Sequence, residues 1–210
     1  MPDYGAVGYW DARYAGQQKN KEELFDWYQT YDGALRNILA PYLRQDLDFE
    51  IFVPGCGNSE LSALLYQEGY RNITNVDKSS VLINYMSGKY AHMAEMEYSI
   101  MDATKLDALP SKCFDLIIDK ALMDALLCGE ESARDVPRMV SEMFRVLKDG
   151  GSYVIVSHGA PANRLPFLEK NKNTNWTVDY KQLQKPRVDG FEDLGASPFH
   201  FVYIMTKRLN

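Results

Sequence analysis

The run Phe49-Glu50-Ile51-Phe52-Val53-Pro54-Gly55-Cys56-Gly57-Asn58-Ser59-Glu60 decides the fold of this 210-residue chain. Its apolar first half predicts a strand that ends at Pro54 and Gly55, and leucines at helical spacing follow, with Asn58 as the expected helix cap. A strand that passes through Gly-x-Gly into a helix brings the backbone close to a ligand at the helix N-terminus. The glycine pair is weak evidence alone, because a plain structural turn has the same pattern.

The third position of this loop separates two classes of ligand. A dinucleotide-binding loop has a third glycine where this chain has Glu60, and a carboxylate there would repel a pyrophosphate. The loop therefore favours a nucleoside ligand without phosphates, and a nicotinamide oxidoreductase is disfavoured.

Two aspartates follow the next two predicted strands. Asp77 stands 22 residues after Gly55 (77 − 55), where a carboxylate can accept hydrogen bonds from ribose hydroxyls; the alternative is a cap for the helix expected near Ser79. Asp102 ends the following strand and is expected to meet an adenine amino group, or else to be a turn residue. Since parallel strands end at one edge of a sheet, the loop and both aspartates support a single ligand site there.

The rest of the pattern predicts an α/β fold: a Rossmann-like, seven-stranded, mostly parallel sheet with helices on both faces. A helix over 136–148 is expected to end at Asp149-Gly150-Gly151. The C-terminal strand patterns have no helical pattern between them and predict an antiparallel pair at the sheet edge. Residues 8–42 are aromatic-rich and are expected to form a helical cover. The expected strands lie over 49–53, 73–76, 97–101, 114–118, 153–156, 176–180 and 199–205.

Composition narrows the class of protein further. With 46% hydrophobic and 25% charged residues the chain is typical of soluble globular proteins, and no apolar run approaches membrane-spanning length. The 29 acidic and 23 basic residues give a net charge of −6, which disfavours nucleic-acid and membrane partners. Three cysteines and three histidines lack zinc-ligand spacing, so no metal is expected, and the cysteine count together with an N-terminus unlike a signal peptide favours the cytoplasm.

Several longer motifs carry a family resemblance over roughly residues 9–165. They are Tyr9-Trp10-Asp11-Ala12-Arg13-Tyr14, Phe25-Asp26-Trp27-Tyr28, Gly55-Cys56-Gly57-Asn58-Ser59-Glu60-Leu61-Ser62, and Asp119-Lys120 followed by Leu122-Met123-Asp124-Ala125-Leu126-Leu127. With these motifs the chain resembles the class I S-adenosylmethionine methyltransferases. Within them it is similar to the elongation factor 1-alpha lysine methyltransferase-like group, which includes the methyltransferase domain once joined by name to endothelin-converting enzyme 2.

The resemblance implies one methyltransferase domain over 1–210, with the cover at 8–42, the cofactor-binding core at 48–158 and a substrate-side segment with the C-terminal strands at 159–210. It implies S-adenosyl-L-methionine as cofactor and S-adenosyl-L-homocysteine as product. One departure is Ala121, which replaces the glycine common after the Asp-Lys pair. The cofactor contacts implied are Trp10, Tyr14, Trp27, Gly55, Gly57, Asp77, Lys78, Asp102, Ala103 and Lys120.

Methyl transfer from a sulfonium is an in-line displacement that depends on positioning, and a lysine acceptor must also lose its proton. Asp119 and Asp124 follow the fourth strand and are the candidate catalytic residues; Asp119 is expected to orient an incoming amine, while Asp124 is equally a helix-terminus charge. His158 follows the fifth strand and is either a base or a hydrogen-bonded structural histidine.

The leading hypothesis is therefore transfer of a methyl group to a lysine of a protein substrate, such as a translation elongation factor. Asp119-Lys120-Ala121-Leu122 stands where enzymes that methylate nucleobase amines often have Asn/Asp-Pro-Pro-aromatic, which argues against that reaction. The alternatives are a small-molecule methyltransferase and a non-catalytic, cofactor-binding partner subunit.

Overall fold

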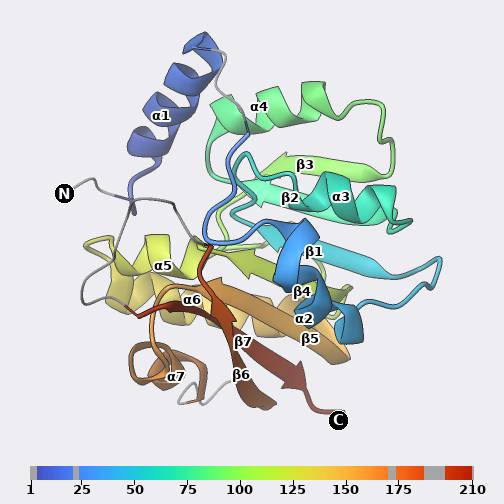
Figure 1. Ribbon diagram of the computed structural model, residues 1–210, viewed down its shortest axis with the longest axis vertical. Helices are drawn as coiled ribbons and strands as arrows, with labels where there is room; N and C mark the ends of the chain where they lie inside the picture. The colour runs from blue at the N-terminus through green and yellow to red at the C-terminus, as the bar shows by residue number, and fades with distance from the viewer. Residues whose placement is uncertain (1–3, 21–23, 170–173, 187–196, 210) are drawn as a thin grey trace.

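A computed structural model describes residues 4–20, 24–169, 174–186 and 197–209, and it confirms a seven-stranded sheet in the order β3-β2-β1-β4-β5-β7-β6 (Figure 1). Strands β1 to β5 are parallel to one another, β7 is antiparallel to β5, and β6 is antiparallel to β7 and forms the edge. The strands are β1 (Glu50–Pro54), β2 (Asn72–Asp77), β3 (Met96–Ile100), β4 (Phe114–Lys120), β5 (Leu147–Ser157), β6 (Trp176–Gln184) and β7 (Phe199–Lys207).

Side chains alternate along the central strands and so build a separate core on each face of the sheet. In β1, Val53 belongs to the core that packs against helices α3 and α4, whereas Phe52 belongs to the core that packs against α5, α6 and α7. Buried residues of α6 recur every three or four positions between Val136 and Val146, as a helix lying on a sheet requires. The helices are α3 (Leu61–Gln67), α4 (Ser80–Lys89), α5 (Leu122–Leu127), α6 (Ser132–Val146) and α7 (Pro161–Glu169).

The N-terminal cover is helical only in part. It consists of α1 (Val7–Asn20), which packs beside α4, and of a π-helix η1 (Tyr31–Leu35), helix α2 (Arg36–Leu39) and a 3-10 turn η2 (Ala40–Tyr42). The prediction of helix through 8–42 is wrong for residues 24–30, which we call the strap. Tyr28 in the strap has φ of 66°, a left-handed conformation that interrupts a helix, and tertiary contacts described below hold it there.

Two local predictions at helix ends are also wrong. Asn58 does not cap α3. Its side-chain amide donates to the Gln17 side chain and its backbone carbonyl oxygen accepts from the Phe25 amide, so Asn58 holds α1 and the strap against the sheet. Helix α6 ends at Val146, and Asp149-Gly150-Gly151 lies within β5, where the pairing with β4 shifts register at a bulge. The bulge needs glycine, because a Cβ on Gly151 would lie 2.9 Å from two backbone oxygens of neighbouring residues.

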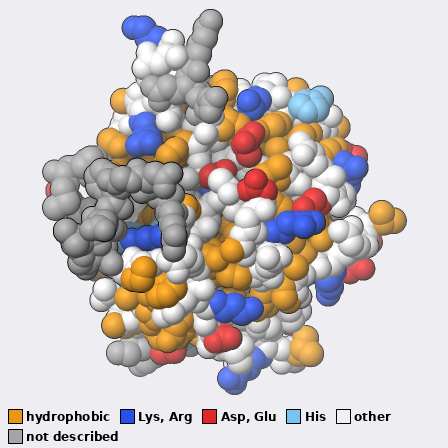
Figure 2. Space-filling view, in the orientation of Figure 1, with side chains coloured by type: hydrophobic (Ala, Val, Ile, Leu, Met, Phe, Trp, Pro, Cys, Tyr) orange, Lys and Arg blue, Asp and Glu red, His pale blue; other side chains and the backbone are white. Residues whose placement is uncertain are grey.

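Among the described residues, no helix is both long and apolar enough to cross a bilayer. On the face shown in Figure 2, acidic and basic side chains are interspersed among hydrophobic ones.

Candidate functional site

A cavity of about 270 Å³ lies at the carboxyl ends of the parallel strands, under the cover. All ten residues expected to contact the cofactor line it, and so does Asp124. Six aromatic side chains from α1, the strap and the residues before α1 line one wall of it: Tyr4, Trp10, Tyr14, Phe25, Trp27 and Tyr28.

The glycine loop after β1 has the close-approach geometry that the sequence predicts. Gly55 and Gly57 have φ of 59° and 54°, and a Cβ on Gly55 would lie 2.9 Å from Leu122 Cβ. A Cβ on Gly57 would lie 3.4 Å from the Tyr14 hydroxyl. Both positions therefore need glycine, since a side chain would be strained there and would push into the cavity wall.

Asp77 faces this loop from the end of β2. Its carboxylate accepts hydrogen bonds from the Gly57 amide at 3.2 Å and from the Ser79 amide at 2.9 Å. Ser79, not Asp77, caps α4, because the Ser79 hydroxyl oxygen accepts from the Leu82 amide. Burial raises the pKa of Asp77 above its ordinary value, and the two amide hydrogen bonds work against that rise. The capping alternative is thus excluded, and the carboxylate is left lining the cavity.

Asp102 has the turn role that its position suggested, and it also lines the cavity. One oxygen accepts from the Thr104 amide and hydroxyl, which makes a turn, and the other pairs with Lys78 at 3.0 Å. Burial raises the pKa of Asp102, but the hydrogen bonds from Thr104 and Lys78 outweigh it and the net pKa is lowered. Ala103 beside it is buried and lines the cavity. This end of the cavity therefore offers carboxylate oxygens as acceptors for hydroxyl and amino donors.

The aromatic wall is held together by ring contacts between α1 and the strap. Trp10 stacks on Tyr14 with centroids 5.8 Å apart and meets Trp27 edge-on at 6.3 Å. The guanidinium of Arg13 lies 5.2 Å from the Trp27 ring centroid. Aromatic faces attract cations, so the three predicted aromatic residues both pack together and present a wall suited to a sulfonium.

Lys120, at the end of β4, anchors the strap to the sheet. Its ammonium pairs with Asp26 at 2.5 Å and donates to the Trp27 carbonyl oxygen at 3.2 Å. Burial lowers the pKa of Lys120, and the charge of Asp26 partly restores it. Asp26 also accepts a short hydrogen bond from Ser59 in the glycine loop. Sequence reasoning named Lys120 and Trp27 but missed Asp26, although the Phe-Asp-Trp-Tyr motif contained it.

Asp119, near the end of β4, and Asp124, in α5, have different surroundings. Asp119 is fully buried and does not line the cavity; it accepts from the amides of Leu122 and Met123 and from the Tyr153 hydroxyl, and burial raises its pKa to about 7. The carboxylate therefore stabilises the start of α5, and the structure gives it no access to an incoming amine.

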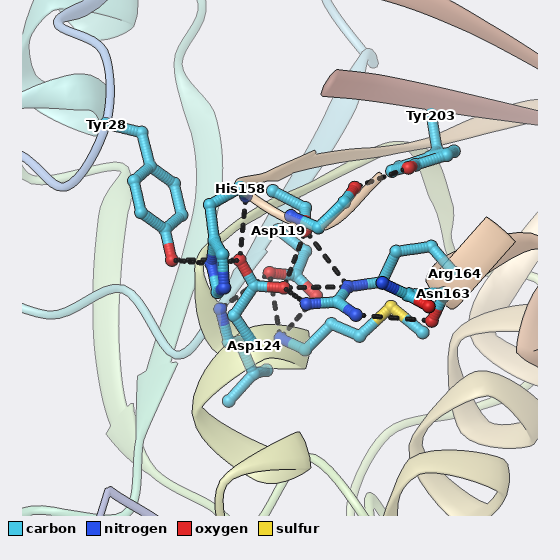
Figure 3. Close-up of polar contacts among 11 residues, drawn as sticks. Tyr28, Asp119, Asp124, His158, Asn163, Arg164 and Tyr203 are labelled. Carbon is cyan, nitrogen blue, oxygen red and sulfur yellow. Dashed lines mark hydrogen bonds and ion pairs between the residues drawn. The ribbon is translucent and has the colours of Figure 1, made fainter. Parts of the chain in front are cut away.

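Asp124, by contrast, lies at the cavity wall in a dense hydrogen-bond network (Figure 3). One oxygen accepts from Ser157 and from two nitrogens of Arg164, and the other from the Tyr28 hydroxyl and the backbone amide of His158. Burial alone would raise the pKa of Asp124, but the hydrogen bond from His158 and the charge of Arg164 hold it well below its usual range. Sequence reasoning missed Tyr28 and Arg164, which come from opposite ends of the chain.

The residues present suit S-adenosylmethionine. The positive-φ glycines allow a ligand to approach the backbone, Asp77 and Asp102 offer acceptors at one end of the cavity, and aromatic side chains line its wall. Among the described residues, no group of three or more histidine, cysteine or acidic side chains is placed to hold a metal ion.

Comparison with known proteins agrees with this geometry. A family model described as "Methyltransferase domain" matches residues 52–155. The N-methyltransferase NodS from Bradyrhizobium japonicum WM9, solved with S-adenosyl-L-homocysteine, has the same fold: the TM-score is 0.59 at 15% identity, over 84% of this chain and 90% of that one. The chain belongs to the class I S-adenosylmethionine-dependent methyltransferases and is a methyltransferase domain.

Within that class, the chain is related to eEF1A lysine methyltransferases. It is 36% identical to "EEF1A lysine methyltransferase 4" of Bos taurus, over 97% of this chain and 76% of that protein. It is 39% identical to the "eEF1A lysine and N-terminal methyltransferase" of Homo sapiens, over 98% of this chain. It spans 29% of the length of that human protein and of its Mus musculus counterpart.

Proposed function

We propose that this domain transfers a methyl group to a lysine side chain of a protein, with a translation elongation factor as the first candidate substrate. The observation that carries the proposal is the 36% identity to an EEF1A lysine methyltransferase over three quarters of that relative's length. The proposal includes a cytoplasmic location for this domain, because a translation elongation factor would be met there.

The cofactor site of the proposal extends along the sheet edge. Asp77 accepts hydrogen bonds from the ribose, and Lys78, Asp102 and Ala103 contact the adenine. Gly55 and Gly57 allow close approach of the backbone. The rest of the cofactor, its sulfonium and methionine part, lies toward β4 and is surrounded by Trp10, Tyr14, Trp27 and Lys120. When bound, S-adenosylmethionine supplies an electrophilic methyl group: a nitrogen–carbon bond forms as the carbon–sulfur bond breaks, and its electron pair remains on sulfur.

In this proposal the acceptor lysine and the adenosine part of the cofactor bind at opposite ends of the cavity, on either side of β1. Residues after β2 and β3 line one end of the cavity, whereas Ala121, Asp124 and His158 after β4 and β5 line the other. Charges at this second end are balanced, because Lys120 pairs with Asp26 and Arg164 with Asp124. A lysine ammonium therefore meets no net positive charge on entry, and we place it beside Asp124.

The test is incubation of the purified protein with labelled S-adenosylmethionine, purified eEF1A and, separately, a whole-cell lysate, with the label located by mass spectrometry. Label on a protein lysine is expected, and Asp77→Asn, which damages the cofactor site, is expected to lose it. Label confined to small metabolites would instead favour a small-molecule methyltransferase. Tight cofactor binding without any transfer would indicate a non-catalytic partner subunit.

A further inference from the structure

At the acceptor end of the cavity, His158 lies directly after β5, beside the end of β4. The neighbouring Ala121 amide donates to the Val156 carbonyl oxygen at 3.1 Å, so the ends of the two strands are tied together there. The His158 side chain is 55% exposed and lines the cavity, whereas that of Asp124 behind it is 4% exposed.

The contacts of His158 determine which of its ring nitrogens carries a proton. Its Nδ1 lies 2.8 Å from Asp124 Oδ2 and 2.9 Å from the Tyr28 hydroxyl. The Tyr28 hydroxyl donates to the same Asp124 oxygen at 2.8 Å, and an ionised carboxylate only accepts. Nδ1 must therefore be the protonated nitrogen of the neutral ring. Its Nε2, which makes no hydrogen bond within the described part of the chain, keeps its lone pair.

The backbone that presents His158 is held in place from both sides. Asp124 accepts from the His158 amide at 3.0 Å, and the Tyr203 hydroxyl donates to the Gly159 carbonyl oxygen at 2.6 Å. A Cβ on Gly159 would lie 2.1 Å from Arg164 Cζ, so the absence of a side chain at 159 lets the guanidinium reach Asp124. Figure 3 shows Tyr28 and His158 on one side of the Asp124 carboxylate and Arg164 on the other.

Backbone conformation also marks this end of the cavity as specialised. In the described part of the chain, three non-glycine residues have positive φ: Tyr28, Lys112 and Ala121. Two of them, Tyr28 and Ala121, line the cavity beside His158. Such conformations persist where surrounding contacts over-determine them, and they gather at functional sites.

From this geometry we infer that His158 accepts the proton of the acceptor lysine through Nε2, with Asp124 fixing the ring through Nδ1. The inference rests on the proposed function. In the step, a proton passes from the lysine ammonium to Nε2, and the nitrogen lone pair becomes free to attack. The Nδ1 proton of the imidazolium stays on the ring and remains hydrogen-bonded to Asp124, whose negative charge offsets the new positive charge. The imidazolium later releases the Nε2 proton to water.

The charged and titratable neighbours of His158 come from four elements. Asp124 follows β4, Tyr28 is in the strap, and Arg164 in α7 faces the far oxygen of Asp124. His200 in β7 lies behind Tyr28, with ring centroids 4.9 Å apart, and burial lowers the pKa of His200 to about 4. His200 is therefore neutral at pH 7 and adds no charge that would oppose protonation of His158.

The experiment compares wild type with His158→Asn, which keeps a donor near the position of Nδ1 but has no basic nitrogen. With eEF1A as substrate, or with a peptide that contains the lysine identified in the labelling test above, the variant is expected to lose about 100-fold or more of its turnover at pH 7. Its rate is expected to rise with pH as the free lysine deprotonates, whereas the wild-type rate reaches a plateau. Calorimetric affinity for S-adenosylmethionine stays unchanged. The control is His92→Asn, at an exposed histidine after α4, which leaves both readouts unchanged.

A second readout requires no acceptor. Nitrogen-15 NMR of the wild-type imidazoles is expected to show the His158 ring protonated at Nδ1 in its neutral form, and the resonance is assigned by its loss in His158→Asn. A ring protonated at Nε2 would overturn the inference. So would lysine methylation by His158→Asn at the wild-type rate with the same pH profile. If wild type binds the cofactor yet methylates no lysine, the proposed function itself falls, and the inference with it.

Discussion

The buried ion pair between Lys120 and Asp26 gives a sharp test of how the strap is held. Lys120 Nζ lies 2.5 Å from Asp26 Oδ1, and the side chains of Lys120 and Asp26 are 5% and 11% exposed. At an effective dielectric constant of about 20, the attraction is about 7 kcal/mol. Asp26→Asn removes that attraction, but Lys120 can shed its proton: neutralising a group of ordinary pKa 10.5 at pH 7 costs at most about 5 kcal/mol. We therefore expect Asp26→Asn to lower the free energy of unfolding by about 3–5 kcal/mol.

The pH dependence of this loss has a definite sign. Burial depresses the pKa of Lys120 in the folded state, and removal of Asp26 depresses it further. Below the folded-state pKa both states bind the proton and the penalty is present in full, because the buried Lys120 must be charged. Between that pKa and 10.5 only the unfolded chain binds the proton, so the penalty shrinks as the pH rises and disappears above 10.5. The deficit of Asp26→Asn should therefore be larger at pH 7 than at pH 9.5.

Urea denaturation at both pH values, followed by far-UV circular dichroism and tryptophan fluorescence, measures the effect. The matched control is Asp107→Asn, which breaks the exposed pair between Lys105 and Asp107 (3.4 Å apart, side chains 74% and 75% exposed) and should cost less than about 1 kcal/mol. Equal, small losses in the two variants would refute the view that Asp26 compensates a buried charge.

Three further substitutions test the cavity. Gly55→Ala forces alanine to φ of 59° against the start of α5 and should weaken S-adenosylmethionine binding about 10-fold or more. The control is Gly88→Ala, which has open space around its Cβ and should leave the affinity unchanged. Equal calorimetric affinities of the two variants would contradict this expectation. Ala121→Gly relieves a left-handed alanine at φ of 79° and should raise the free energy of unfolding by about 1 kcal/mol. Ala125→Gly, inside α5, should lower that free energy by a similar amount. A fall of the urea midpoint in both variants would show that Ala121 is not strained. Asp77→Asn replaces one carboxylate oxygen by an NH2 group and should weaken cofactor binding by about 10- to 100-fold; it also loses one of the two amide hydrogen bonds from Gly57 and Ser79, so a small fall in melting temperature is expected, and unaltered affinity would exclude the ribose role.

The end of the cavity that we propose to hold the cofactor was predictable because its residues are local in sequence. Gly55 and Gly57 stand in one loop, and Asp77 and Asp102 each follow a strand whose apolar pattern shows where it ends. Parallel strands deliver their ends to one edge, so a strand pattern alone brings these residues together. The family resemblance added the aromatic residues of the cover, whose helical spacing by itself indicates only packing.

The acceptor half was only partly predictable. Asp119 and Asp124 were both candidate catalytic residues in the sequence, yet Asp119 is fully buried at the end of β4 and only Asp124 lines the cavity. The strap was expected to be helical as part of the aromatic-rich stretch 8–42. Its actual path depends on the Lys120–Asp26 pair and on the contact of Tyr28 with Asp124, both made with residues more than ninety positions away.

The sequence by itself thus determined the sheet, the glycine loop and the aspartates at the strand ends, because hydrophobic periodicity and glycine conformation act over a few neighbouring residues. Only the tertiary structure decided the network of Tyr28, Asp124, His158 and Arg164, which come from the strap, α5, the end of β5 and α7. Burial and electrostatic interaction depend on distances in space, and no spacing along the chain encodes which distant charges will meet.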